Sequence, residues 1–209
     1  MVDISKLAEQ RVLLQNISWQ FFENLLEELG EKRSHRITYY QGQLEIMTPL
    51  WAHENYNRLI DRLIVSLIEE LNLEVWMGGS VMLKRANMNV GKEPDSCYYI
   101  QNEGRVRGKT DLNFNVDPPP DLVLEIDLGG SHLNQLILYA DLNIPEVWRY
   151  DGSKIYFYQL NHGAYVECDR SPTFSLLSAA EVHEYLEQCK TLGLTTALGQ
   201  FRTWIANQL

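Results

Sequence analysis

The sequence predicts a mixed α/β domain in which helices flank a central β-sheet. Helical and extended patterns alternate along its 209 residues, in the order helix, hairpin, helix, strands, helix, strands and two helices. The clearest elements are a long amphipathic helix over 52–72 and an apolar strand over 121–127. A chain of this length can bury one sizeable core, so residues 1–209 are expected to form a single domain.

The N-terminal part is expected to contain one helix and one hairpin, whereas residues 1–16 carry no clear pattern. Ser18 is a suitable N-cap for the helix, and Gly30 is suited to end it. Over residues 36–49, β-branched and aromatic residues lead to a Gln41-Gly42 turn and then to an alternating strand. This pattern is typical of a β-hairpin.

The helix over 52–72 has apolar residues at i, i+3, i+4 and i+7 along one face and charged residues along the other. This spacing is typical of a helix that packs on a sheet. Strands are expected over 74–85, 96–100 and 121–127. The stretch 101–120 ends in three prolines and is expected to be a loop.

The remaining elements follow a Gly-Gly break after the third of these strands. They are a short helix capped by Ser131, strands over 144–150, 154–160 and 164–168, and helices over 178–189 and 195–208.

Composition narrows the class of protein. Apolar residues make up 45% of the chain, which is typical of a globular fold, and the three cysteines are too scattered for a disulfide framework or a zinc site. The N-terminus lacks a signal-peptide pattern and no apolar run is long enough for a membrane span, so a cytoplasmic protein is expected. The net charge of −10 argues against a module that coats nucleic acid by charge alone.

Carboxylates around the apolar strand are the best candidates for chemistry. Glu125 stands in its interior, where ionisation is costly without a compensating cation. Glu125 and Asp127 are two residues apart and share one face, and Asp95 begins a neighbouring strand. Converging carboxylates suit Mg²⁺ or Mn²⁺ better than zinc. The alternative is that these residues pair with Arg or Lys.

Several segments occur together in a specific order. They are Gly42–Pro49, His53 at the start of the long helix, Pro94-Asp95, Pro120–Asp127 and Tyr139–Trp148. With them, the run over 36–160 resembles a large bacterial family of unknown function whose members are described as restriction endonucleases. That family has the PD-(D/E)xK nuclease fold.

The resemblance implies a restriction-endonuclease-like domain with a mixed central sheet, an N-terminal helix and two C-terminal helices. It implies Mg²⁺- or Mn²⁺-dependent hydrolysis of DNA, with Asp95, Glu125 and the Ile126 carbonyl as metal ligands. The lysine of the motif would stand two residues after Glu125, where this chain has Asp127. The helical position at which the family often has a lysine instead is Gln135, which can orient water but supplies no charge.

Weaker candidates surround this set. Glu45 resembles an acidic position near the family's site, and His53 is placed to contact a phosphate or a metal-bound water; a surface role for the first and a structural role for the second are the alternatives. Lys84 and Arg85 are candidates for the missing positive charge, although solvated side chains are the simpler interpretation.

Three functions are compatible with the sequence. The leading one is a metal-dependent endonuclease acting on DNA. The second is a nuclease fold without catalysis that serves as an oligomerising or binding module, because the motif lysine is missing and the chain is acidic. A glycosidase-type pair of carboxylates ranks last, since no aromatic platform accompanies it. A homodimer is expected only because dimers are the commonest assemblies.

Overall fold

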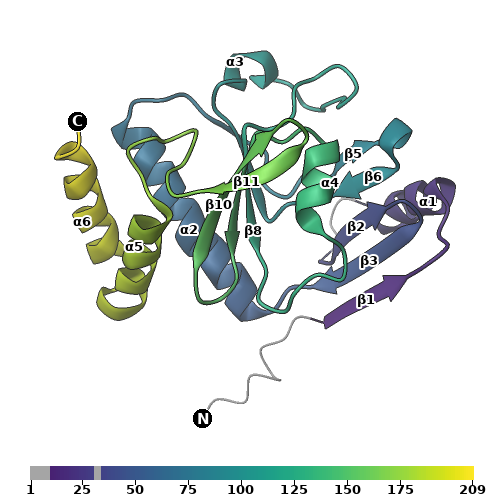
Figure 1. The fold of residues 1–209 in the computed structure, drawn as a ribbon, viewed down its shortest axis with the longest axis horizontal. Coiled ribbons are helices and arrows are strands. Elements are labelled where there is room, and N and C mark those ends of the chain that lie inside the picture. The colour runs from purple at the N-terminus through teal and green to yellow at the C-terminus, as the bar shows by residue number, and fades with distance from the viewer. Residues whose placement is uncertain (1–9, 31–33) are drawn as a thin grey trace, which may run out of the picture.

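The computed structural model describes residues 10–30 and 34–209, and its strands form two sheets (Figure 1). A five-stranded sheet has the order β1-β3-β2-β6-β5, and a six-stranded sheet has the order β11-β10-β9-β8-β7-β4. The pair β8–β9 is parallel, and every other pair in these sheets is antiparallel. The mixed α/β fold is confirmed, but the expectation of one sheet is wrong.

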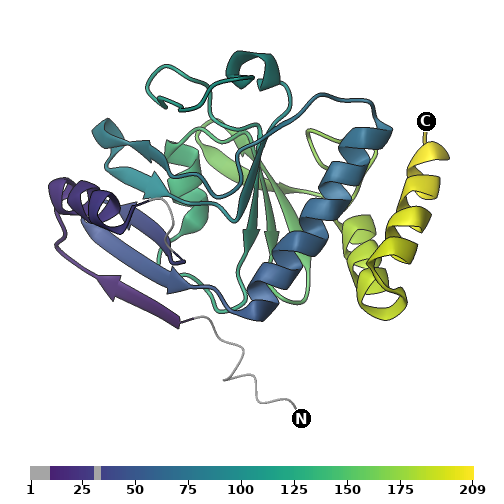
Figure 2. The same cartoon turned by 180° about the vertical axis from the view of Figure 1, so that it is seen from behind.

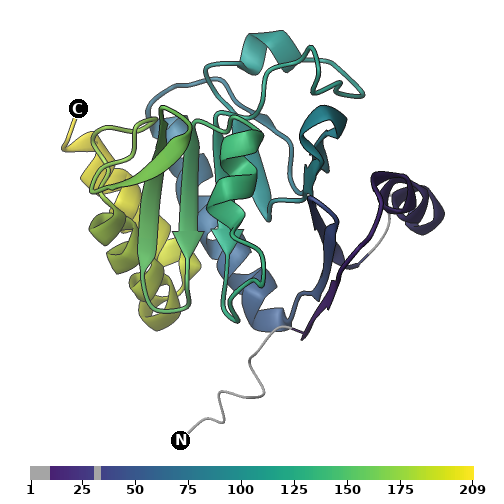
Figure 3. The same ribbon diagram turned by 45° about the vertical axis from the view of Figure 1, so that its right-hand side comes forward.

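The five-stranded sheet is built around the predicted hairpin. Its strands are β1 (Gln10–Leu14), β2 (Arg36–Tyr40), β3 (Gln43–Thr48), β5 (Leu83–Arg85) and β6 (Val90–Lys92). Helix α1 (Trp19–Leu29) covers its outer face and begins at Ser18, whose hydroxyl accepts a hydrogen bond from the Phe21 N–H at 3.1 Å (Figure 3). The hairpin and α1 confirm the predictions, whereas β1 and β6 were not predicted.

The six-stranded sheet holds the main core. Its strands are β4 (Trp76–Met77), β7 (Ser96–Tyr99), β8 (Leu122–Ile126), β9 (Glu146–Tyr150), β10 (Ile155–Asn161) and β11 (Ala164–Cys168). Helix α2 (Trp51–Glu70) lies across one face, with α5 (Ala179–Leu192) and α6 (Leu194–Ala206) beside it (Figure 2). Helix α4 (Gln135–Asp141) covers the other face.

Strand β8 separates two apolar clusters, and this fixes the direction of its polar residues. Leu124 and Ile126 belong to the core beneath α2, whereas Val123 belongs to the cluster beneath α4. Because successive side chains in a strand point to opposite faces, Glu125 lies on the α4 face. The predicted separation of Glu125 from Leu124 and Ile126 is therefore confirmed.

Two local predictions need correction. The stretch 101–120, expected to be a loop, contains a short helix, α3 (Glu103–Val106). Outside this stretch, a 3₁₀ turn, η2 (Ala86–Met88), precedes β6. The N-cap of α4 is Asn134, whose side chain accepts hydrogen bonds from the N–H groups of the next turn. The hydroxyl of Ser131, the predicted cap, instead donates to Glu45 on β3. The three cysteines are free, and no helix in the described ranges is long and apolar enough to cross a membrane.

Close packing between α1 and β6 gives a test of this arrangement. A Cβ atom added at Gly91 would lie 2.5 Å from the Phe22 ring, whereas one added at Gly104 would meet nothing within 4 Å. We expect Gly91→Ala to lower the free energy of unfolding by about 1–3 kcal/mol, because the buried ring must shift. Gly104→Ala should leave it unchanged within about 1 kcal/mol. Urea denaturation measures both, and equal stabilities would contradict the packing of α1 on β6.

Candidate active site

The predicted carboxylates lie where the chain crosses from one sheet to the other. Lys92 ends β6 of the five-stranded sheet, and Ser96 begins β7 of the six-stranded sheet. Ser96 pairs with Leu124, so the antiparallel register continued by one residue sets the backbone of Asp95 beside that of Glu125. The Asp95 N–H donates to the Leu124 carbonyl at 3.2 Å. The sheets thus bring together two carboxylates that are distant in sequence.

Asp95 is buried and held from three directions. Its Oδ2 accepts from the Ile126 N–H at 2.8 Å and lies 3.2 Å from Nε2 of His53, while Oδ1 lies 3.7 Å from Nε of Arg36. Burial by itself would raise the pKa of Asp95, but the hydrogen bond and charge of His53, the charge of Lys92 and the Ile126 N–H lower the pKa below its usual value. Asp95 is therefore held ionised.

His53 is fully buried at the start of α2. A side chain with no exposed surface cannot reach a phosphate at the surface, so its contact with Asp95 favours an orienting role. Contact of His53 with a phosphate or a metal-bound water stays a prediction.

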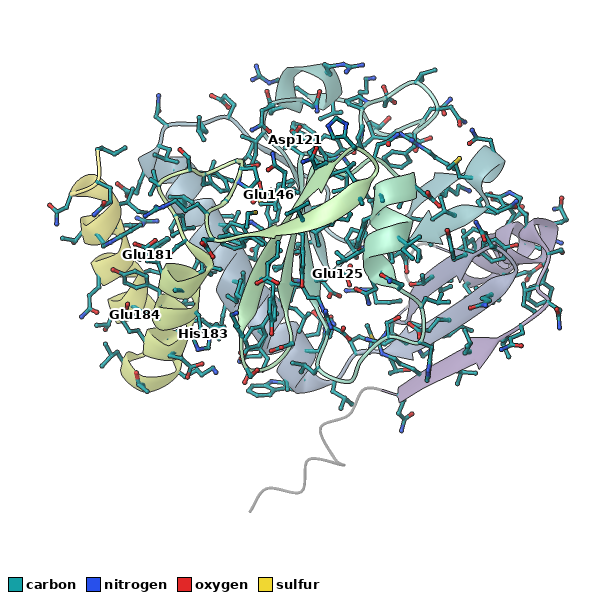
Figure 4. All side chains as sticks on the ribbon, viewed as in Figure 1. Asp121, Glu125, Glu146, Glu181, His183 and Glu184 are labelled. Atoms are coloured by element: carbon teal, nitrogen blue, oxygen red, sulfur yellow. The ribbon has the colours of Figure 1, made fainter. Side chains whose placement is uncertain are left out.

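Glu125 is only 2% exposed and lies between β8 and α4, near the middle of the view in Figure 4. One carboxylate oxygen, Oε1, accepts from the Tyr139 hydroxyl, and Oε2 lies 3.2 Å from Nζ of Lys92. Burial raises the pKa of Glu125 to about 7; Lys92 opposes the rise, Asp95 adds to it and Tyr139 opposes it. Near neutral pH, Glu125 lies close to the midpoint between its charged and neutral forms.

Lys92 and Tyr139 are residues of the site that the sequence interpretation missed. Lys92 is 5% exposed on β6, and its charge acts on both Asp95 and Glu125. Tyr139 is fully buried on α4. The presence of Lys92 three residues before Asp95 was the available signal, but a three-residue strand has no periodicity that would have shown its direction.

Asp127 is engaged in a second set of ion pairs. Its Oδ2 accepts from Nε and Nη2 of Arg149 at 3.1 and 2.7 Å, and its Oδ1 lies 3.6 Å from Nη2 of Arg11. This is the Arg-paired alternative that the sequence had left open. A catalytic role for Asp127 stays a prediction.

Gln135 opens α4 and is 8% exposed. Its Oε1 is buried and has no hydrogen-bond partner among the described residues. Together with Asp127, His132 and Arg149 it lines a cleft of about 460 Å³. The cleft gives solvent a route to the residue at the helical lysine position of the family.

Glu45 is a buried anchor, not a surface carboxylate. It is 2% exposed on β3 and accepts from Nη1 of Arg11, from the Ser131 hydroxyl and from the His132 N–H, each at 2.8 Å. Glu45 therefore fixes the loop that leads into α4. A catalytic role for Glu45 stays a prediction.

The cations proposed from sequence lie elsewhere. Nζ of Lys84 donates to Glu23 at 2.7 Å with 40% of its side chain exposed, and Arg85 donates to the Asp141 carbonyl at 3.4 Å. Neither interaction involves Asp95 or Glu125, so these two residues are not the positive charge of this site. Arg36, which lies 3.7 Å from Asp95, borders a larger cleft of about 900 Å³ on the α1 side.

No group of three or more His, Cys, Asp or Glu side chains within residues 10–30 and 34–209 is arranged to hold a metal ion. A metal at this position would have two side-chain ligands, Asp95 and Glu125. The role of the Ile126 carbonyl stays a prediction, and the structure shows only that the Ile126 N–H binds Asp95.

Comparison of the sequence with known protein families gives a match. The sequence profile of the Uma2 family, described as "Putative restriction endonuclease", matches residues 19–194. The chain belongs to the Uma2 family. The match extends beyond the segment 36–160 that carried the resemblance, and includes α1 and α5.

A solved structure with low sequence identity has a similar fold. A crystal structure titled as a putative nuclease belonging to DUF820, from Anabaena variabilis ATCC 29413, is similar with a TM-score of 0.51 and 15% sequence identity. The similarity covers 78% of this chain and 97% of that one, and at this identity it shows the fold alone. No curated protein matches the Uma2 chain.

The raised pKa of Glu125 predicts a pH dependence of stability in metal-free buffer. The folded protein binds this proton more tightly than the unfolded chain, whose ordinary pKa is 4.5, so this contribution is full below pH 4.5 and is lost as pH rises to about 7. Relative to Glu125→Gln, the wild type should lose up to about 3 kcal/mol over that range, at about 1.4 kcal/mol per pKa unit. Urea denaturation with EDTA at pH 5, 6, 7 and 8 measures the difference, and a constant difference would contradict the burial of Glu125.

Proposed function

We propose that this Uma2 protein is a metal-dependent endonuclease that hydrolyses phosphodiester bonds in DNA with Mg²⁺ or Mn²⁺. Membership of a family described as restriction endonucleases supports this substrate class. The observation that carries the proposal is the pair Asp95 and Glu125, buried side by side at the crossover between the sheets. The single charge of Lys92 lies beside these two buried carboxylates, and a divalent cation would offset the repulsion that remains between them.

The residues present fit a hard divalent cation. Asp95 and Glu125 offer only oxygen atoms, which Mg²⁺ and Mn²⁺ prefer. The pKa of Glu125 is raised to about 7, so the donors around it do not fully compensate its burial. When bound, the ion would polarise the scissile phosphate and make water a better nucleophile.

The surrounding residues position these two ligands. His53 and the Ile126 N–H hold Asp95 in its ionised form, and Tyr139 fixes one oxygen of Glu125. Gln135 has a buried oxygen without a partner beside a cleft, so it can orient a water by hydrogen bonding. Together these groups hold the carboxylates in place, so less reorganisation is needed at the moment of reaction.

A binding or oligomerising module is the second candidate. It is favoured by internal charge pairing, because Glu125 faces Lys92 and Asp127 faces Arg149. The exposed loop after β7 adds little free positive charge, since Arg107 pairs with Glu103 and Lys109 pairs with Asp117. Such a module would use the fold without turnover.

A cleavage assay separates the two functions. We expect relaxation of supercoiled plasmid by the wild type with Mn²⁺ or Mg²⁺ and none with EDTA. Asp95→Asn and Glu125→Gln should each reduce the rate at least about 100-fold, because each removes a ligand charge of the metal. The control Glu184→Gln changes an exposed carboxylate on α5, away from the site in Figure 4, and should cleave at the wild-type rate. Absence of cleavage by the wild type with either ion, together with absence of metal binding by calorimetry, would favour the binding module.

A further inference from the structure

Hydrolysis of a phosphodiester needs positive charge beside the phosphate, and neither family position supplies it in this chain. Negative charge grows on the phosphate oxygens in the transition state, and fixed cations stabilise it. The position two residues after Glu125 is Asp127, which is acidic and bound by Arg149. The helical position is Gln135, which is neutral. If the site hydrolyses DNA, any protein cation that assists the metal must come from another position.

Lys92 is the lysine that lies at the carboxylate pair. Its Nζ is 3.2 Å from Oε2 of Glu125, and its charge lowers the pKa of both Glu125 and Asp95. The side chain is 6% exposed, so solvent screens this charge little. Nζ also lies 5.9 Å from the centre of the Tyr139 ring, which confines the ammonium to the space between β6, β8 and α4.

The other cations near the site form ion pairs with carboxylates other than Glu125. Arg36 lies 3.7 Å from Asp95 but also pairs with Glu54 at 3.3 Å on the edge of the large cleft. Arg149 makes two hydrogen bonds to Asp127. Lys84, on the strand beside β6, pairs with Glu23.

We propose that Lys92 is the cationic catalytic residue of this site, provided by the five-stranded sheet in place of the lysine that the family pattern puts directly after β8 or on α4. The inference rests on the proposed function. In the hydrolysis, the water oxygen forms a bond to phosphorus and the bond from phosphorus to the sugar oxygen breaks. One proton is lost by the water and one is gained by the sugar oxygen. Lys92 keeps its protons and contributes charge and hydrogen bonds.

The position explains how a lysine could be exchanged between elements without rebuilding the site. What the chemistry requires is an ammonium near the two carboxylates, and the direction from which its stem arrives does not change the field at the phosphate. The crossover between the sheets sets β6 against the same face of β8 that α4 covers. A stem from β6 therefore reaches the space that a stem from α4 would otherwise fill.

Charge-changing variants at this position test the inference. Lys92→Gln keeps a hydrogen-bond donor for Glu125 but removes the charge, and Lys92→Arg keeps the charge. The control Lys84→Met removes a lysine from the neighbouring strand that does not contact the carboxylates. Three quantities are measured for each: plasmid cleavage with Mn²⁺, calorimetric Mn²⁺ binding without DNA, and the melting temperature by circular dichroism.

We expect Lys92→Gln to cleave at least about 100-fold more slowly than wild type while it binds Mn²⁺ at least as tightly, because a cation next to the ligands has been removed. Lys92→Arg should stay within about tenfold of wild type, and Lys84→Met should be unchanged. Wild-type cleavage by a folded Lys92→Gln would overturn the role of Lys92 and leave the nuclease function intact. Loss of both cleavage and Mn²⁺ binding would also overturn it, since Lys92 would then act on the site's structure.

The role of Lys92 can still be tested if Lys92→Gln does not fold. In that case Lys92→Arg is the test: cleavage within about tenfold of wild type supports a charge requirement, and a loss above about 100-fold in a folded protein contradicts it. A wild type that binds Mn²⁺ but does not cleave DNA would remove the proposed function, and the inference with it.

Discussion

The buried ion pair between Lys92 and Glu125 joins the two sheets of this protein beside the point where the chain passes from one to the other. Lys92 belongs to β6 of the five-stranded sheet, and Glu125 belongs to β8 of the six-stranded sheet. Removing either partner would leave a buried charge uncompensated, at a cost of about 3–5 kcal/mol. The relative placement of the sheets near this point therefore depends on the pair. Two apolar side chains would join the sheets at lower cost, so stability alone does not account for the pair.

A second ionic network connects the same two sheets and positions α4. Arg11 of β1 reaches both Glu45 and Asp127, and Asp127 is also bound by Arg149 of β9. Glu45 in turn binds the hydroxyl of Ser131 and so fixes the start of the segment that becomes α4. Helix α4 carries Tyr139, whose hydroxyl binds Glu125. Glu45 thus acts on the carboxylate pair through the backbone, at a distance, although it contributes no ligand to it.

Local patterns were enough to predict the larger elements but not how the strands were shared between sheets. The spacing of apolar residues predicted α2, and the turn at Gln41-Gly42 predicted the hairpin, because both depend on neighbours in sequence. Strand β6 has only three residues and includes Gly91, so it has no alternation to detect. Without β6, the hairpin had no second partner and one sheet was the simplest arrangement.

The carboxylates of the site were predictable and their partners were not. Glu125 stood out because a charged residue inside an apolar strand is costly wherever that strand lies. That Lys92 rather than Gln135 faces it depends on the packing of two sheets, and no local pattern encodes such a contact. The same holds for Asp127, because the parallel register of β8 and β9 sets Arg149 beside Glu125, two residues before Asp127, and Arg149 reaches Asp127 from there.

The acidity of the whole chain and a phosphate substrate are compatible because the relevant charges are local. A net charge of −10 disfavours long-range attraction to DNA, but exposed charges farther away than about 8–10 Å are largely screened at physiological salt. Inside the site, Asp95 and Glu125 face Lys92 and His53 in a medium that screens poorly. One divalent cation added there would give this cluster a positive balance, while the exterior stays acidic. Attraction to a phosphate would then depend on the metal and be confined to the site, unlike that of a basic protein that coats DNA along its length.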